Sequence, residues 1–120
     1  MDPLSKFGDF LIKATYDKVL LRLDMLVLGE LRTPLVKDLQ NKVSAMSVED
    51  KKTLRSVVED LLANALHDLL FAIQVSHDMN SGVEVIVDGR NVVELSDGLN
   101  AEIFGSDGWI ERFGEYKSRL

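Results

Sequence analysis

The chain has 120 residues, 46% of them hydrophobic and 28% charged, which excludes an intrinsically disordered chain and fits one domain with a single core. The absence of cysteine excludes disulfides, a thiol nucleophile and cysteine-ligated zinc or iron–sulfur centres. The net charge is −6, and residues 59–115, with two basic and twelve acidic residues, carry −10, which disfavours nucleic acid and acidic membranes as partners.

The N-terminal segment predicts neither a signal peptide nor a membrane span. Charged residues interrupt it before any continuous apolar stretch develops. The most apolar run nearby, residues 25–29, is far shorter than the roughly 20 residues that a spanning helix needs. We therefore expect a cytoplasmic protein that forms a single domain over residues 1–120.

The first helix is predicted over residues 5–28, with Gly29 as its C-terminal stop. Its charged residues, Asp17 and Asp24 among them, predict a solvated face, and the run from Val19 to Leu28 is apolar on nearly all sides. The apolar residues that recur at helical spacing predict the buried stripe: Phe7, Phe10, Leu11, Ala14, Leu21 and Met25.

Two further helices are predicted in the middle of the chain. Thr33 and Pro34 indicate the start of one that runs to about Ala45, and its predicted inward residues are Leu35, Val36, Leu39 and Val43. Ser47 caps the next, which runs from Val48 to about His77. The apolar residues of this long helix cover more than half its circumference, which predicts neighbours on two sides: Leu54, Val57, Val58, Leu61, Leu62, Ala65, Leu66, Leu69, Leu70 and Ile73.

A β-hairpin is predicted where the apolar period changes from helical to alternating. Residues 83–87 and 91–95 flank Asp88-Gly89-Arg90, which indicates a three-residue loop. That register places five apolar residues on one face and sets Glu84 opposite Glu94, an unfavourable pair. The apolar face is Val83, Val85, Val87, Val93 and Leu95. An isolated ribbon is marginally stable, so we expect it to pack on the helices or to pair with another chain.

Two short helices, residues 97–104 and 107–116, are predicted to follow the hairpin. Each begins after a Ser-Asp-Gly unit, residues 96–98 and 106–108, whose polar side chains suit a helix start. Large apolar residues at helical spacing behind the second unit either enter the core or anchor a partner, because Trp and Tyr dominate interface hot spots. The candidate partner-binding residues are therefore Asp97, Glu102, Asp107, Trp109, Glu111, Phe113, Glu115 and Tyr116.

Catalytic and metal-binding motifs are sparse. The two histidines, His67 and His77, each precede an aspartate, but ten helical residues separate them by about 15 Å along the helix axis, too far for one metal ion. No nucleophile elbow and no phosphate-binding glycine loop occurs. We therefore expect no cofactor, no metal and no enzymatic activity. A small metal-dependent hydrolase using His67 and Asp68 is the alternative from another class.

Two stretches in the last 55 residues carry a resemblance to a known group. Residues 66–71 (LHDLLF), followed by a hairpin and then by residues 95–99 (LSDGL) and 108–113 (GWIERF), resemble a group of small uncharacterised bacterial proteins. Some small acidic bacterial proteins of this kind are immunity proteins that neutralise toxins. The resemblance implies binding to a protein partner and carries over no catalytic residue.

Together these features predict a mainly α (α+β) fold with a three-helix core, a β-hairpin and two short C-terminal helices. The predicted function is that of a non-enzymatic interaction module whose acidic, aromatic C-terminal half binds a basic protein. An acidic surface that serves only solubility is the simpler alternative for the charge. A structural homodimer, joined through residues 19–28 or through the hairpin edge, is a further alternative.

Overall fold

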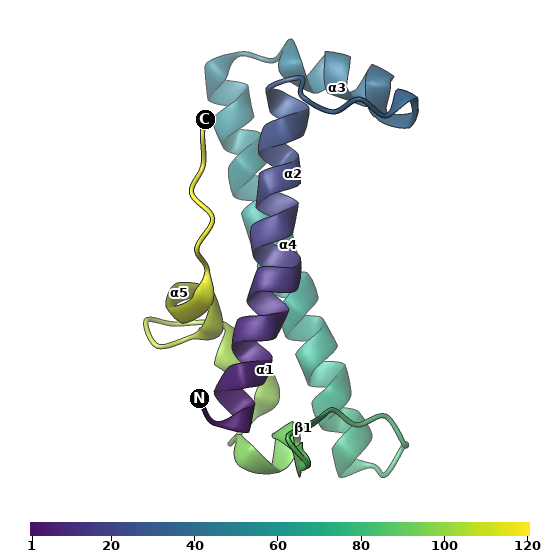
Figure 1. Ribbon diagram of the computed structural model, residues 1–120, viewed down its shortest axis with the longest axis vertical. Helices are drawn as coiled ribbons and strands as arrows, with labels where there is room; N and C mark the ends of the chain where they lie inside the picture. The colour runs from purple at the N-terminus through teal and green to yellow at the C-terminus, as the bar shows by residue number, and fades with distance from the viewer.

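Two long antiparallel helices form the body of the protein. The computed structural model describes all residues from Met1 to Leu120. The first long helix consists of α1 (Pro3–Leu11), a π-helical turn η1 (Ile12–Tyr16) and α2 (Asp17–Val27), and the second is α4 (Val48–Asp78). They run side by side along the length of the molecule (Figure 1). The mainly α fold class predicted from the sequence is confirmed.

The helix ends follow local capping chemistry. Asp2 accepts a hydrogen bond from the Ser5 backbone N–H at 2.9 Å, with Pro3 in the first turn. Ser47 accepts one from the Asp50 N–H at 3.1 Å, as predicted for the start of α4. Gly29 follows α2 with a φ of +72°, a conformation that favours glycine, and confirms the predicted stop.

The π-helical turn rotates the buried face of the first helix. The Asp17 N–H bonds to the Ile12 carbonyl, five residues back, so one extra residue is inserted into the helix. One residue turns the helix by about 100°, and the stripe predicted from a regular period is therefore wrong after Leu11. Ala14 and Leu21, which follow the turn, are exposed, and Phe10, which precedes it, is exposed as well. The residues buried instead are Ile12, Leu20, Leu23 and Val27.

A short 3₁₀ turn η2 (Pro34–Val36) and helix α3 (Lys37–Ser44) cross the end of the helical pair and project to one side (Figure 1). Of the four residues predicted to point inward, Val43 alone is buried, while Leu35 and Leu39 are exposed. Val43 forms a small cluster with Leu23 and Val27, against which Val58 packs. The second predicted helix therefore covers one end of the fold rather than lining the main core.

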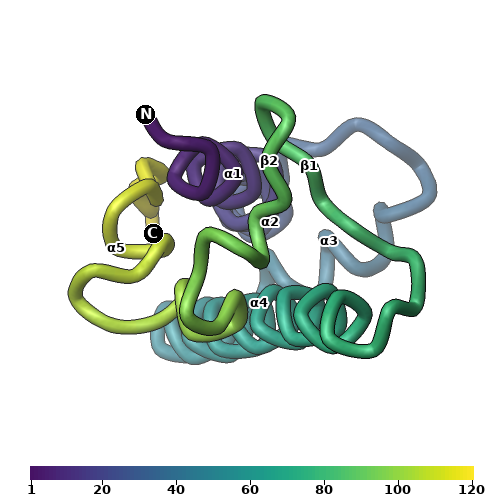
Figure 2. Tube along the Cα trace, turned by 90° about the horizontal axis from the view of Figure 1, so that it is seen from below, coloured from purple at the N-terminus to yellow at the C-terminus, as the bar shows by residue number.

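The main core lies at the other end, where the C-terminal third of the chain packs on the helical pair (Figure 2). Two 3₁₀ helices, η3 (Val92–Leu95) and η4 (Leu99–Ile103), and the short helix α5 (Trp109–Phe113) contribute to it. One face of α4 is buried and the opposite side of its apolar circumference is exposed. The core cluster comprises Phe7, Leu11, Ile12, Leu66, Leu70, Ile73, Val92, Val93, Leu99, Ile103 and Trp109.

The hairpin is present, but it is shorter than predicted and has a different loop. Strands β1 (Ile86–Val87) and β2 (Arg90–Asn91) pair antiparallel, Val87 with Arg90. The loop has two residues, Asp88 and Gly89, whose φ values of 51° and 77° are those of a type I′ turn. The predicted three-residue loop is therefore wrong, and so is the Glu84–Glu94 pairing.

Residues 92–95 leave the ribbon because Asn91 caps the next helix. The Asn91 side-chain oxygen accepts a hydrogen bond from the Val93 N–H at 3.0 Å and starts the 3₁₀ helix η3. In η3 the adjacent residues Val92 and Val93 are both buried, whereas an alternating strand would expose one of them. Val83, predicted to lie on the buried face of the ribbon, is exposed.

Candidate functional site

An acidic hollow lies between η4 and the loop that precedes α5. Its volume is about 400 Å³. The two Ser-Asp-Gly units border it, because each stands directly before a short helix, at Leu99 and at Trp109. The nine lining residues are Asp97, Gly98, Ala101, Glu102, Phe104, Gly105, Ser106, Asp107 and Gly108.

The carboxylates of the hollow have no cationic partner in the chain. No lysine, arginine or histidine nitrogen lies within 4.0 Å of Asp97, Glu102 or Asp107. Glu102 accepts a hydrogen bond from Ser96 Oγ at 3.0 Å, which fixes its carboxylate near the hollow. The hollow therefore presents negative charge that only a molecule from outside can neutralise.

Phe104 supplies an apolar surface inside this acidic site. Phe104 is 47% exposed, although Ile103 directly before it and Gly108 four positions after it are buried. Gly108 is required there because a Cβ would lie 2.3 Å from the Phe104 carbonyl oxygen. An exposed aromatic ring among unpaired carboxylates suits a side chain that is both cationic and apolar, such as arginine or lysine.

His67 ties the hollow to α4. Its Nε2 lies 3.3 Å from Asn100 Nδ2, and its Nδ1 lies 3.1 Å from Asp68 Oδ1. The imidazole is parallel to the Phe71 ring, with centroids 6.4 Å apart, and 5.7 Å from the Phe104 ring. Both ring nitrogens thus face partners within the chain, so His67 holds η4 against α4.

The predicted partner-binding residues do not form one surface. Asp97, Glu102 and Asp107 meet in the hollow, and Glu111 is exposed on α5 without an ion pair. Phe113 is half-buried, with the Arg112 guanidinium 4.6 Å from its ring centroid. The side chains of Glu115 and Tyr116 turn toward the first long helix, as described below.

Trp109 belongs to the core. Its side chain is 0% exposed, and its ring meets the Phe7 ring edge to face at 5.7 Å between centroids. Gly8 permits this approach, because a Cβ on Gly8 would lie 2.6 Å from the indole. The Trp109 Nε1–H has no hydrogen-bond partner. Of the two roles left open by the sequence, Trp109 has the structural one and contacts no partner directly.

The last seven residues form an extended segment, residues 114–120, that is held by carboxylates of α2. The predicted helix over 107–116 ends at Phe113, so Tyr116 lies outside it. Asp17 accepts hydrogen bonds from the Glu115 and Tyr116 N–H groups, at 3.1 and 3.2 Å. Lys13 lies 3.4 Å from the Glu115 carboxylate.

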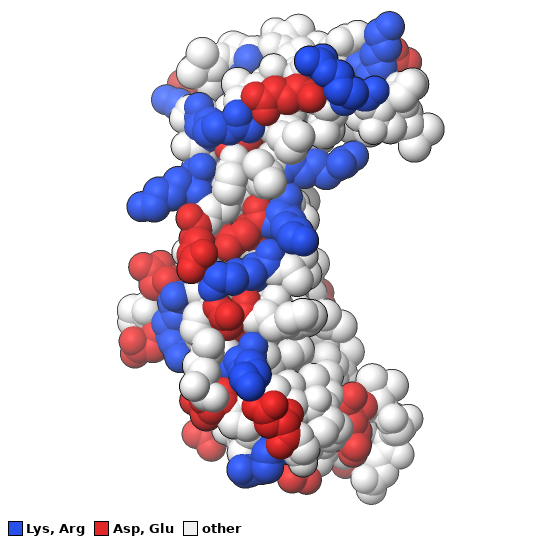
Figure 3. All heavy atoms as spheres, viewed as in Figure 1, with Lys and Arg blue, Asp and Glu red and all other residues white.

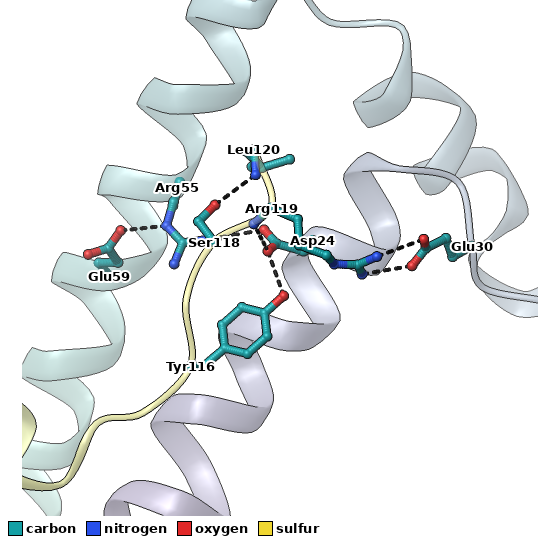
Figure 4. A network of polar contacts seen from close by, with 8 residues as sticks. All are labelled: Asp24, Glu30, Arg55, Glu59, Tyr116, Ser118, Arg119 and Leu120. Atoms are coloured by element: carbon teal, nitrogen blue, oxygen red, sulfur yellow. Dashed lines mark hydrogen bonds and ion pairs between the residues drawn. The ribbon is translucent and has the colours of Figure 1, made fainter.

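Asp24 is the centre of the polar network shown in Figure 4, and its side chain is 0% exposed. It accepts hydrogen bonds from Arg55 Nη1 at 3.1 Å, Tyr116 OH at 2.6 Å and the Arg119 N–H at 2.9 Å. One buried carboxylate thus joins α2, α4 and the C-terminal segment. The prediction that Asp24 lies on a solvated face is wrong.

The end of the C-terminal segment is fixed by a bidentate ion pair. Arg119 Nη1 and Nη2 donate to the two Glu30 oxygens at 2.9 and 2.7 Å. These bonds hold the pKa of Glu30 below its ordinary value of 4.5 and raise that of Arg119. Desolvation, followed by the bond to Asp24, raises the pKa of Tyr116 above 10.0.

These shifts predict a loss of stability in acid. Because the folded state binds a proton on Glu30 more weakly than the unfolded chain does, the Glu30 contribution is complete above its unfolded pKa. It is lost as the pH falls through the lowered folded value. Asp2, whose pKa the Ser5 N–H holds below 3.8, acts in the same sense. We expect the urea midpoint to fall between about pH 5 and about pH 2.

The matched variant is Glu30→Gln, which should remove part of this acid dependence and leave the rest of the profile unchanged.

The contribution of Tyr116 to stability depends on pH in the opposite direction. Because its pKa is raised in the folded state, the contribution is present at lower pH and disappears as the pH rises through the folded pKa. Tyr116→Phe should therefore reduce the loss of stability at alkaline pH, with the remainder due to Tyr16, whose pKa burial also raises. An urea midpoint that is constant in acid would contradict this account.

The acidic residues of the chain do not converge on a metal site. The structure contains no group of three or more His, Asp or Glu side chains placed to hold one ion. His67 and Asp68 are the residues of the hydrolase alternative. His67 contacts Asp68 through one ring nitrogen and Asn100 through the other, and it contacts no second carboxylate. None of the helices combines the length and the apolar character that crossing a bilayer requires.

Several functional features could not be found from sequence periodicity. Phe104 gave no signal, because its exposure depends on the turn at Gly105 and on the close approach of Gly108. Asp17 and Asp24 did show a pattern in the sequence, because they are seven residues apart and so lie on one face of α2. What covers that face is the C-terminal segment, 90 or more residues later.

Comparison of the chain with protein-family models, with curated proteins and with solved structures finds no match in any of the three. The resemblance of the C-terminal segments to small bacterial proteins therefore stays a prediction.

Proposed function

We propose that the protein is a non-enzymatic interaction module that binds a basic protein through the acidic hollow, in the manner of an immunity protein that neutralises a toxin. The observation that carries the proposal is the set of unpaired carboxylates of Asp97, Glu102 and Asp107 around the exposed ring of Phe104. In this proposal the protein acts in the cytoplasm and uses no cofactor. Its negative charge speeds the encounter with a basic partner.

The arrangement of charge supports this choice of partner. Three of the seven ion pairs join the long helices to each other, to the hairpin or to the C-terminal segment, three lie within one helix, one joins Arg119 to Glu30, and none reaches the hollow. Red spheres lie along the left-hand edge of the molecule in Figure 3, over α5 and the loop before it. A lysine or arginine of the partner would meet the carboxylates while its methylene groups packed on Phe104.

A binding titration with a fluorescent peptide rich in arginine and lysine tests the proposal. The variant Asp97→Asn/Glu102→Gln/Asp107→Asn should weaken binding about tenfold, because three exposed charge contacts are worth about 0.5 kcal/mol each. Binding to the unchanged protein should weaken as salt is added. Phe104→Ala should lower the affinity without changing the salt dependence.

The matched control is Asp38→Asn/Asp60→Asn/Glu84→Gln, which removes the same three charges from exposed positions outside the hollow. It should leave the affinity near that of the unchanged protein. Equal weakening in the two triple variants would show a non-specific charge effect and reject the site. The product of the adjacent gene, tested with the same variants, is the partner that the immunity interpretation predicts.

A further inference from the structure

One side of the helical pair carries apolar residues with nothing packed on them. At one end of this side Val58 packs on the cluster of Leu23, Val27 and Val43, so α3 covers it. At the other end Ser76 Oγ accepts a hydrogen bond from the Val83 N–H at 3.0 Å, so the segment after α4 covers it. The stretch of α4 between these two ends is open.

The residues of this open stretch are apolar. Leu61 is 62% exposed and Leu69 is 48% exposed, and Ala65, midway between them, is exposed too. Steps of four residues keep them on one side of α4 over about 12 Å. Val19 of α2 is also exposed, one turn before Leu23, which faces α3 on this side. We call Val19, Leu61, Ala65 and Leu69 the open face.

The open face lies between the two covered ends of the helical pair. α3 projects to the right at the top of Figure 1, and the segment after α4 projects to the same side at the bottom. Between them, the right-hand margin of the molecule in Figure 3 carries blue spheres below α3 and red spheres near the lower projection, with a white stretch in the middle. An apolar surface framed in this way is typical of an interface.

The chain as a whole exposes more surface than a compact monomer of its mass. The accessible surface is 7511 Å² for a chain of 13.4 kDa, whereas a compact monomer of that mass exposes about 6,500 Å². The excess of about 1,000 Å² compares with the roughly 800 Å² that each partner buries in a standard interface. The radius of gyration, 16.9 Å, likewise exceeds the value of about 14 Å for a compact domain of this length.

We propose that a second copy of the chain covers the open face and that the protein is a symmetric homodimer. A two-fold axis near Ala65 sets Leu61 of one copy against Leu69 of the other, with the small Ala65 side chains allowing the two α4 helices to approach. The four residues of the open face are apolar, so the face is complementary to a second copy of itself, with the exposed carboxylate of Asp68 at its border. The two helical pairs then form a four-helix assembly.

This interface leaves the acidic hollow free, so it is independent of the proposed function. η4 is held by His67, which follows Ala65 by two residues and therefore lies about 200° around α4. The hollow and the open face are thus on different sides of the same helix. Each dimer would present two hollows.

Light scattering on the purified chain tests the dimer. The expected mass is twice 13.4 kDa at about 100 µM, which is well above the micromolar Kd of the weakest interfaces of standard size. Leu61→Glu/Leu69→Glu should give the mass of one chain with an unchanged helical circular dichroism spectrum. The matched control is Leu21→Glu, an exposed leucine that follows Val19 by two residues and so points away from the open face. This control should remain a dimer.

Three outcomes overturn the proposal: a wild-type mass of one chain at that concentration, a Leu61→Glu/Leu69→Glu variant that stays dimeric, or a Leu21→Glu variant that dissociates equally. If the double variant loses its helical spectrum, single cysteine substitutions test the interface instead, since the chain has no cysteine of its own. Ala65→Cys should form a disulfide-linked dimer in air, because the two-fold axis brings its copies together. Ala14→Cys, exposed on η1, should not, and equal cross-linking of both would also reject the interface.

Discussion

Trp109→Ala lowers the free energy of unfolding by about 3–5 kcal/mol, the cost of truncating a fully buried aromatic side chain. The loss is this large because the indole fills the space between Phe7 and Gly8 of α1, where no other side chain can replace it. A domain of this size has a total stability of about 5–15 kcal/mol, so the variant should be close to unfolding. Urea titration followed by circular dichroism measures the change.

Two further variants test whether the loss of stability in Trp109→Ala comes from lost core packing. Trp109→Phe should cost less than Trp109→Ala, since an aromatic ring remains and the indole N–H that is lost makes no hydrogen bond. Phe104→Ala, which removes an exposed aromatic residue five positions earlier, should change stability little. If Trp109→Ala unfolds at the wild-type urea concentration, the core position of Trp109 is wrong.

Asp24→Ala is expected to cost about 3–5 kcal/mol and to release the C-terminal segment. The change leaves the Tyr116 hydroxyl and the Arg119 N–H without their acceptor and removes one of the two carboxylate partners of Arg55, which keeps Glu59 at 3.0 Å. Breaking a buried ion pair on one side is strongly destabilising. The half-exposed pair of Arg119 with Glu30 is worth about 1 kcal/mol or less and does not compensate. Hydrogen exchange at the Arg119 amide reports the release directly.

Asp24→Asn keeps an acceptor oxygen and loses the charge, so its cost should lie between those of the wild type and Asp24→Ala. Asp38→Ala, at an exposed position of α3 without an ion pair, is the matched control and should stay within about 0.5 kcal/mol of the wild type. Unchanged exchange at Arg119 in Asp24→Ala would show that the segment is held by other contacts.

The first long helix shows where sequence periodicity stops being informative. Its existence, its proline start and its glycine stop follow from local chemistry. The π-helical turn at residues 12–16 inserts one residue, and nothing in a regular 3.6-residue pattern signals it. Of the apolar positions assigned beyond Leu11, Ala14 and Leu21 are therefore exposed and Met25 is half-buried, and Asp24 was assigned to solvent although it is the centre of a buried network.

The hairpin and the C-terminal third likewise combine features that the local sequence determines with features that it does not. The turn residues Asp88 and Gly89 located the hairpin, because positive φ at two successive positions restricts the choice of residue. The length of the strands depended instead on Asn91, whose side chain competes for the backbone and starts η3. Local alternation of apolar residues could not show which of these two hydrogen-bonding patterns wins.

The amino-acid sequence alone determined the mainly α class, the capped ends of the long helices, the hairpin and the acidic character of residues 59–115, since each depends on neighbours within a few residues. The tertiary structure decided the fate of the large side chains: Trp109 in the core, Phe104 in the acidic hollow, Leu61 and Leu69 on the open face. Burial is a property of what packs on a residue from elsewhere in the chain, and that is set by long-range contacts that local periodicity does not encode.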